Sequence, residues 1–138
     1  MFKRFMNRMK NRKGFSLVEL LIVIAIIGII ATIAIPILLG ARRNAIREKA
    51  RNSLRSLVSA EQAYYATYGQ YGTMGQLAAP PNGEAPYVDT QTSTGNLGPE
   101  ITIAVDDAQV STFDVSCTTV DPAVPDFTAD ETGEIVEV

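Results

Sequence analysis

The sequence lacks histidine and tryptophan, and its 138 residues include a single cysteine, Cys117. One cysteine excludes an intrachain disulfide and the several thiolates of a structural zinc site. Without histidine, the commonest general base and metal ligand is missing, so any catalysis would depend on carboxylates. We therefore expect a protein that is not an enzyme and that holds no metal or cofactor.

Basic residues are absent after Arg55. Six of the twelve Lys and Arg residues crowd the first 13 positions, and the other six form a later basic band. This basic band consists of Arg42, Arg43, Arg47, Lys49, Arg51 and Arg55. From Glu61 to Val138 there are 13 acidic residues, which would repel a phosphate backbone. No direct nucleic-acid site is evident, and a nucleic acid would have to use the basic band or another subunit.

A long apolar run begins at Leu20. It continues to Ala41 for 22 residues without a charge, which is enough to cross a bilayer as a helix. The run exceeds the roughly 7 to 15 apolar residues of a cleaved secretory signal, and no clean A-x-A cleavage site follows it. Positive charges flank both ends in nearly equal number, so the positive-inside rule does not decide the orientation.

The residues just before this run form a specific pattern. Residues 13 to 20 read KGFSLVEL, in which Glu19 places a carboxylate at the edge of the hydrocarbon, where a charge is costly. From Lys13 to Gly40 the chain resembles the class III signal of type IV pilins and type II secretion pseudopilins, and it is most like a type IV major pilin. Beyond about Tyr71 the resemblance becomes generic.

The resemblance implies a cleaved leader. A prepilin peptidase would cut after Gly14 on the cytoplasmic side and would then methylate the new amine of Phe15. A glycine at this position lets the extended substrate backbone approach the protease closely. The resemblance also implies an inner-membrane assembly platform as a partner and places the acidic segment outside the cytoplasm.

The same resemblance gives Glu19 a role in assembly, in which its carboxylate meets the N-terminal amine of a neighbouring subunit and sets the register. An unpaired charge among packed apolar helices would be strongly destabilising. The alternative is an interfacial Glu19 that only reaches the lipid headgroups. Gly28 and Pro36 both weaken a helix, and the resemblance implies local melting between them, with a simple proline kink as the alternative.

The helix is expected to continue to about Tyr68, where Gly69 can end it. Its second half shows a helical face, which consists of Ile46, Ala50, Leu54, Leu57, Val58, Glu61, Tyr65 and Tyr68. We expect the basic band to lie near membrane lipids before assembly and near the acidic head of another subunit afterwards. The alternative is a solvated face with local pairs such as Glu48 with Arg51.

Residues 78 to 99 read as a long surface loop, and strand signals follow. Alternation predicts strands at Ile101–Val105 and Phe113–Cys117, with a turn at Asp106 and Asp107. Two further strands are expected at 124–129 and 134–138. Cys117 falls on the apolar side of its strand, which favours a buried small hydrophobe.

These features predict an α+β fold with a long N-terminal helix, whose first half is transmembrane and whose second half packs on a small antiparallel sheet head. The expected divisions are a leader at 1–14, a membrane and filament-core helix at 15–41, and an amphipathic helix with its β head at 42–138. Calcium at the C-terminal carboxylates, such as Asp126 and Glu131, is a weaker alternative, because no EF-hand spacing is present.

The resemblance implies a structural subunit of a homo-oligomeric helical filament, anchored in the bacterial inner membrane before assembly and extracellular afterwards. Such a type IV pilus would support adhesion, twitching motility or DNA uptake. A type II secretion pseudopilin is the alternative. A membrane-anchored carboxylate enzyme is a remote third, because Asp106 with Asp107 and Asp130 with Glu131 both read as turns.

Overall fold

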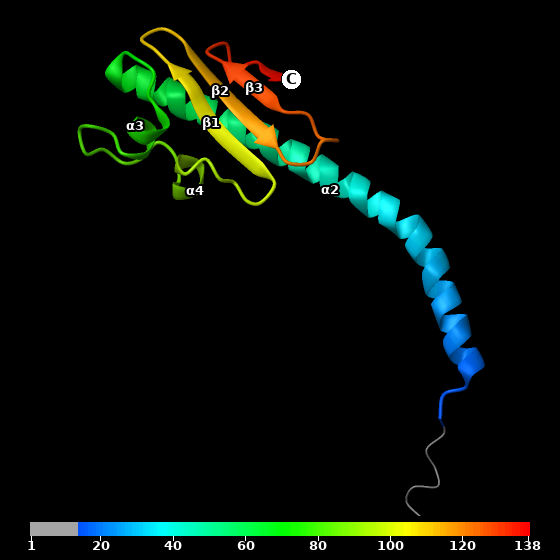
Figure 1. Cartoon of the computed structure of the whole chain (residues 1–138). Helices are drawn as coiled ribbons and strands as arrows, with labels where there is room; N and C mark the ends of the chain where they lie inside the picture. Colours follow the sequence, from blue (N-terminus) through cyan, green and yellow to red (C-terminus); the bar gives the residue numbers. More distant parts are fainter. Residues whose placement is uncertain (1–13) are drawn as a thin grey trace, which may run out of the picture. The chain divides into compact units, whose positions relative to one another are not determined.

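A single long helix links the two parts of this structure, a computed structural model that describes residues 14 to 138. Helix α2 runs from Leu17 to Tyr68, and the chain divides into two units between Leu39 and Gly40. The first unit contains the apolar half of α2. The second unit, which we call the head, contains the rest of α2 and all the strands (Figure 1).

Helix α2 ends where a glycine allows the chain to turn back. Gly69 adopts a φ of 70° and donates its N–H to the carbonyl of Tyr65 at 2.8 Å. This left-handed conformation suits a residue without a side chain and is the common way to close a helix. The helix end predicted at Tyr68 and Gly69 is therefore confirmed.

The head contains one four-stranded antiparallel sheet in the order β1-β2-β3-β4. Its strands are β1 (Ile101–Ala108), β2 (Phe113–Thr119), β3 (Phe127–Asp130) and β4 (Ile135–Glu137). Alternate residues of β2, namely Phe113, Val115 and Cys117, are buried against the helix, as their alternation predicted. The predicted α+β fold class is confirmed.

The core lies between the sheet and the second half of α2. Each buried residue of α2 has another buried residue three or four positions away, the spacing that keeps them on one helical face. They are Ile46, Ala50, Leu54, Leu57, Val58, Ala60, Glu61 and Tyr64. Tyr64 rather than Tyr65 belongs to this face, because Tyr65 remains 41% exposed. The predicted helical face thus included Tyr65 at a position where the structure buries Tyr64 instead.

The predicted turn at Asp106 and Asp107 was also wrong. Both residues lie inside β1, where the pairing with β2 shifts between Val105 and Asp107. Asp106 is the extra residue of this bulge, which lets two exposed aspartates follow each other without breaking the strand. The connection to β2 comes later, at residues 109 to 112.

The segment predicted as a long surface loop is partly ordered. It starts within α3 (Met74–Ala78) and includes α4 (Thr90–Ser93), and Val88 and Leu97 are buried in the core. Asp89 begins α4 by accepting a hydrogen bond from the N–H of Thr92. Part of this segment is therefore helical, and Val88 and Leu97 hold it against the core of the head.

Candidate processing and assembly segment

The start of α2 is built by a reciprocal pair of hydrogen bonds. The Ser16 hydroxyl accepts from the N–H of Val18 at 3.3 Å, and Glu19 Oε2 accepts from the N–H of Ser16 at 2.8 Å. This is close to the arrangement that a serine followed three residues later by a glutamate produces at helix starts, and it satisfies two of the otherwise unpaired amides. A carboxylate in the first turn also interacts favourably with the helix dipole. Glu19 therefore has a local role in this single chain, which sequence reasoning missed although the S-x-x-E spacing could have shown it.

The predicted cleavage site lies immediately before this cap. Gly14 is exposed and has open space around it, and Phe15 is 83% exposed. The rest of the predicted leader, residues 1 to 13, lies outside the described residues. Cleavage after Gly14 and methylation of Phe15 thus stay predictions, at a position that the structure leaves accessible.

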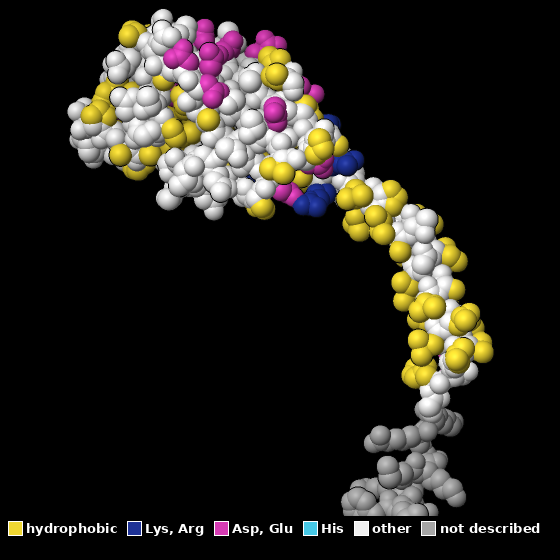
Figure 2. Space-filling model, viewed as in Figure 1, with side chains coloured by type: hydrophobic (Ala, Val, Ile, Leu, Met, Phe, Trp, Pro, Cys, Tyr) yellow, Lys and Arg dark blue, Asp and Glu magenta, His cyan; other side chains and the backbone are white. Residues whose placement is uncertain are grey.

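The first half of α2 is apolar on every side. One stretch of 18 residues in this helix has a mean hydropathy of 3.1, and none of it is buried within the chain. Its length and composition are sufficient to cross a membrane. Figure 2 shows the hydrophobic side chains exposed along this half of α2. A helix that is apolar all round needs lipid or other helices as its surroundings.

Gly28 and Pro36 lie within an unbroken stretch of this helix. The proline has no N–H, so the carbonyl four residues earlier, that of Thr32, lacks its usual intrahelical donor. The Thr32 hydroxyl donates to the carbonyl of Gly28 at 2.8 Å, a side-chain bond that slightly destabilises and often bends helices. Three features that weaken a helix thus fall within one short stretch. Local melting in an assembled filament stays a prediction.

Most side chains of the basic band bond to the sheet side of the same head, at or near the strands and not along α2. Arg42 pairs with Glu100, Arg43 with Asp121 at 3.2 Å, and Arg51 with Glu137 at 2.5 Å. The predicted local pair between Glu48 and Arg51 is also present, at 3.9 Å. Sequence reasoning missed the pairs within the head, because their partners lie 58 to 86 residues away along the chain.

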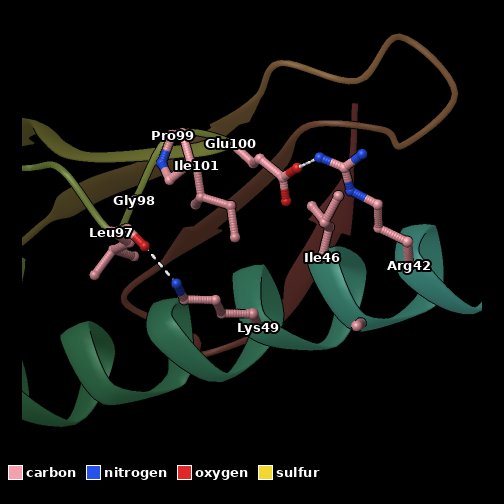
Figure 3. A pocket seen from close by; sticks show the side chains of 9 residues that line it. Arg42, Ile46, Lys49, Leu97, Gly98, Pro99, Glu100 and Ile101 are labelled. Carbon is pink, nitrogen blue, oxygen red and sulfur yellow. Dashed lines mark hydrogen bonds and ion pairs between the residues drawn. The ribbon is translucent and has the colours of Figure 1, made fainter. Parts of the chain in front are cut away.

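One end of the basic band lines a pocket of about 170 Å³ between α2 and residues 97–101. Figure 3 shows Arg42 pointing to Glu100 and the Lys49 ammonium donating to the carbonyl of Leu97. Ile46 and Ile101 form the apolar wall between them. Because both cations have a partner in the same chain, this pocket is a structural junction between the helix and the sheet.

The C-terminal carboxylates form turns and pairs within the chain. Asp126 accepts from the N–H of Thr119, and Asp130 accepts from the N–H and hydroxyl of Thr132. The hydroxyl and the N–H of Thr132 lower the pKa of Asp130. Between residues 14 and 138, the structure contains no group of three His, Cys, Asp or Glu side chains that could hold a metal ion.

Comparison with known proteins adds the decisive observation. Residues 9–35 match the family model described as the prokaryotic N-terminal methylation motif. The chain carries a prepilin-type methylation motif. The predicted resemblance to type IV pilins and type II secretion pseudopilins is confirmed.

Two kinds of relative match the chain over a limited length. The type IV major pilin protein PilA of Myxococcus xanthus is 38% identical over 56 residues, 41% of this chain and 26% of that protein. The type IV wide pilus major component PilA4 of Thermus thermophilus is 65% identical over 37 residues, 27% of this chain and 28% of that protein.

The second kind is the type II secretion system core protein G of Pectobacterium carotovorum, 39% identical over 54 residues, which cover 39% of this chain and 35% of that protein. The matched part of the chain thus spans about a quarter to a third of the length of these relatives. None of the three is named as an enzyme.

Proposed function

We propose that this chain is the structural subunit of a type IV pilus, a homo-oligomeric helical filament. In this proposal a prepilin peptidase removes residues 1–14 and methylates Phe15, and an inner-membrane assembly platform adds the subunit to the filament. The filament supports adhesion, twitching motility or DNA uptake. The observation that carries the proposal is the methylation motif at residues 9–35, which extends into the half of α2 that is apolar on all sides.

The exposed apolar half of α2 explains why such a subunit needs two environments. Burying a side chain such as Leu or Ile contributes about 1.5–3 kcal/mol, and this half of the helix exposes more than a dozen of them. Membrane lipid covers these side chains before assembly, and the same helices of neighbouring copies cover them in the filament core. The domain divisions 1–14, 15–41 and 42–138 belong to this proposal.

The proposed orientation puts the N-terminus in the cytoplasm and the head outside it. The subunit is single-pass in the bacterial inner membrane until it is assembled and is extracellular afterwards. The methylation motif supports this orientation, because the proposed prepilin peptidase would cut on the cytoplasmic side, whereas the positive charges on both sides of the span do not decide it.

The second candidate function is a pseudopilin of a type II secretion system. It is favoured by the similarity to core protein G over 54 residues. A deletion strain separates the two candidates, because loss of surface filaments supports the pilus and retention of secreted proteins behind the outer membrane supports the pseudopilus.

The assembly role of Glu19 can be separated from its role in starting the helix. Glu19→Gln removes the charge but keeps a side-chain oxygen that accepts the Ser16 N–H, since glutamine serves equally in this capping arrangement. Ser16→Ala is the matched control, because it removes the hydroxyl that accepts the Val18 N–H and keeps the charge.

We expect Glu19→Gln to insert in the membrane and lose its leader normally but to reduce the yield of sheared filaments at least tenfold, because the pair with the neighbour's amine is lost. Ser16→Ala should keep a yield within about twofold of wild type, since an N-cap contributes about 1 kcal/mol. The reverse pattern would assign Glu19 to helix capping alone. A main filament band whose N-terminal sequence begins at Met1 rather than at methylated Phe15 would refute the processing step.

A further inference from the structure

A carboxylate is buried in the head with no cation beside it. Glu61 lies on the buried face of α2, and its exposed fraction is 0%. It is the only charged residue in the buried set of the described chain. The basic band ends at Arg55, six residues earlier and roughly 9 Å along the helix, and Arg55 points its guanidinium to Asn52. Glu61 therefore has no ion pair within the described residues.

The carboxylate of Glu61 connects α2 to the segment that returns from it. Its Oε2 accepts from the N–H of Gly72 at 2.9 Å, across 11 residues of chain. Its Oε1 is buried and makes no hydrogen bond with the described part of the protein. We call residues 69–73, which connect α2 to α3, the return segment. Ionised Glu61 is thus a buried charge with one of its two oxygens unsatisfied, which is a costly arrangement.

The return segment fits tightly over this carboxylate. A Cβ added at Gly72 would lie 3.0 Å from the ring of Tyr64, so the tyrosine ring packs directly on the glycine backbone. Tyr64 is 1% exposed and stacks on Tyr68 at 4.4 Å between ring centroids. Moving the return segment away from α2 would therefore remove the Gly72 N–H from the carboxylate and open this side of it to water.

The return segment also holds the far end of the sheet. The N–H of Tyr71 donates to the carbonyl of Gln109, in the connection between β1 and β2, at 3.1 Å. The Tyr71 ring lies 4.6 Å from that of Phe113 and 4.7 Å from that of Tyr65. Opening the return segment would therefore release the aromatic cluster that covers this end of the head.

We propose that Glu61 and the return segment form a proton-operated latch, which is closed when Glu61 is protonated and loosens when the carboxylate ionises. Protonation removes the charge and keeps the acceptor for the Gly72 N–H. Ionisation favours the open form, in which water surrounds the carboxylate. The latch is a property of the head and does not depend on whether the filament is a pilus or a pseudopilus.

The electrostatic surroundings fit this direction. Burial raises the pKa of Glu61 to about 7, against a smaller opposing effect of the Gly72 hydrogen bond. The titratable groups that interact electrostatically with it are Tyr64 on α2 and Tyr71 on the return segment, and Glu131 in turn interacts with Tyr71. The pKa values of both tyrosines are raised, so both stay neutral at physiological pH. No group on either element offers a positive charge to the carboxylate.

The test is amide hydrogen exchange on the full chain in detergent micelles, corrected for the intrinsic effect of pH. If the closed form has a pKa of about 7 and the open form an ordinary 4.5, the opening constant of residues 69–73 should rise about tenfold between pH 6 and pH 8. Glu61→Gln keeps an acceptor for Gly72 and should lose this rise. Glu134→Gln, an exposed carboxylate near the C-terminus, is the matched control and should behave as wild type.

Two results would overturn the latch. One is exchange of residues 69–73 that is independent of pH in wild type after correction. The other is the same pH dependence in Glu61→Gln as in wild type. Should the Glu61→Gln chain fail to fold, the carboxyl ¹³C titration of the wild-type chain decides the matter, because a latch requires one carboxyl group that titrates near pH 7 and its absence refutes it.

Discussion

We predict that Arg51 holds the C-terminal strand to the helix. With one cysteine, the chain has no intrachain disulfide that could do so. Its guanidinium pairs with Glu137 of β4 at 2.5 Å and lies 5.4 Å from the ring centroid of Phe127 on β3. One side chain on α2 thus contacts the last two strands of the sheet. We predict that Arg51→Ala loosens β4 and destabilises the head.

The magnitude follows from the exposure of these groups. The side chains of Arg51 and Glu137 are 34% and 47% exposed, so their ion pair should contribute about 0.5 kcal/mol. The guanidinium over a largely buried ring adds about 0.5–1 kcal/mol. With the packing of its aliphatic stem, Arg51→Ala should cost about 1.5 kcal/mol, or a melting temperature roughly 8 °C lower for a head of this size. Arg51→Lys keeps the charge without the planar group and should cost about half as much.

The assay is a double-mutant cycle with Glu137→Gln, measured by thermal unfolding of the chain in detergent micelles. Arg51→Ala should cost about 0.5 kcal/mol less in the Glu137→Gln background, and 1 M NaCl should remove this coupling. Amide exchange of Ile135–Glu137 should accelerate in Arg51→Ala. If Arg51→Ala cost no more than Glu137→Gln alone, or left exchange in β4 unchanged, the contact with Phe127 would contribute nothing and the reasoning would be wrong.

Three other predictions concern the head. Gly95→Ala should cost about 2–3 kcal/mol, because φ at Gly95 is +71° and the new Cβ would lie 2.7 Å from the carbonyl oxygen of Ile103. The control is Gly75→Ala, because Gly75 lies in α3 with open space around it; this change should be neutral or stabilising by up to about 1 kcal/mol. Equal melting temperatures for the two variants would contradict the prediction. Because the folded pKa of Glu61 is raised to about 7, its stabilising effect is full below about pH 4.5 and lost as pH rises through 7. Glu61→Gln should therefore be more stable than wild type at pH 8, by about 3 kcal/mol in thermal unfolding, and this difference should disappear below about pH 4.5. Burial raises the pKa of Cys117 to about 11, so its thiol should resist iodoacetamide at pH 8 until the head unfolds.

The N-terminal half of the fold was predictable because its signals are local. Hydropathy, the absence of charge and the KGFSLVEL pattern lie within about 30 consecutive residues. Gly69 likewise marks the end of α2 through its own conformational freedom. Only the capping bond of Glu19 was overlooked, since the same residue also fits a role in assembly.

The head was harder because its contacts join distant residues. Glu61 looked like an interruption of an apolar face, and nothing near it in sequence indicates that Gly72 returns to cover it. Asp106 and Asp107 looked like a turn because paired aspartates favour turns, but the bulge keeps both exposed within β1. Alternation predicted which faces of β2 are buried, whereas the strand limits and the partners of the basic band depend on packing.

The two ends of the head depend on different forces, and this difference can be measured. At the end where α2 enters, Arg42 and Arg43 pair with Glu100 and Asp121 across partly exposed surfaces that salt screens. Figure 2 shows Lys and Arg side chains gathered at this end. At the other end, aromatic rings and the buried carboxylate of Glu61 hold the chain, and salt has little access to them.

Raised ionic strength should therefore accelerate amide exchange near residues 97–101 and leave residues 69–73 unchanged. Raised pH should accelerate intrinsically corrected exchange at residues 69–73 and leave residues 97–101 unchanged. If both segments responded together to either change, the head would open as one cooperative unit and the two ends would not be separately controlled.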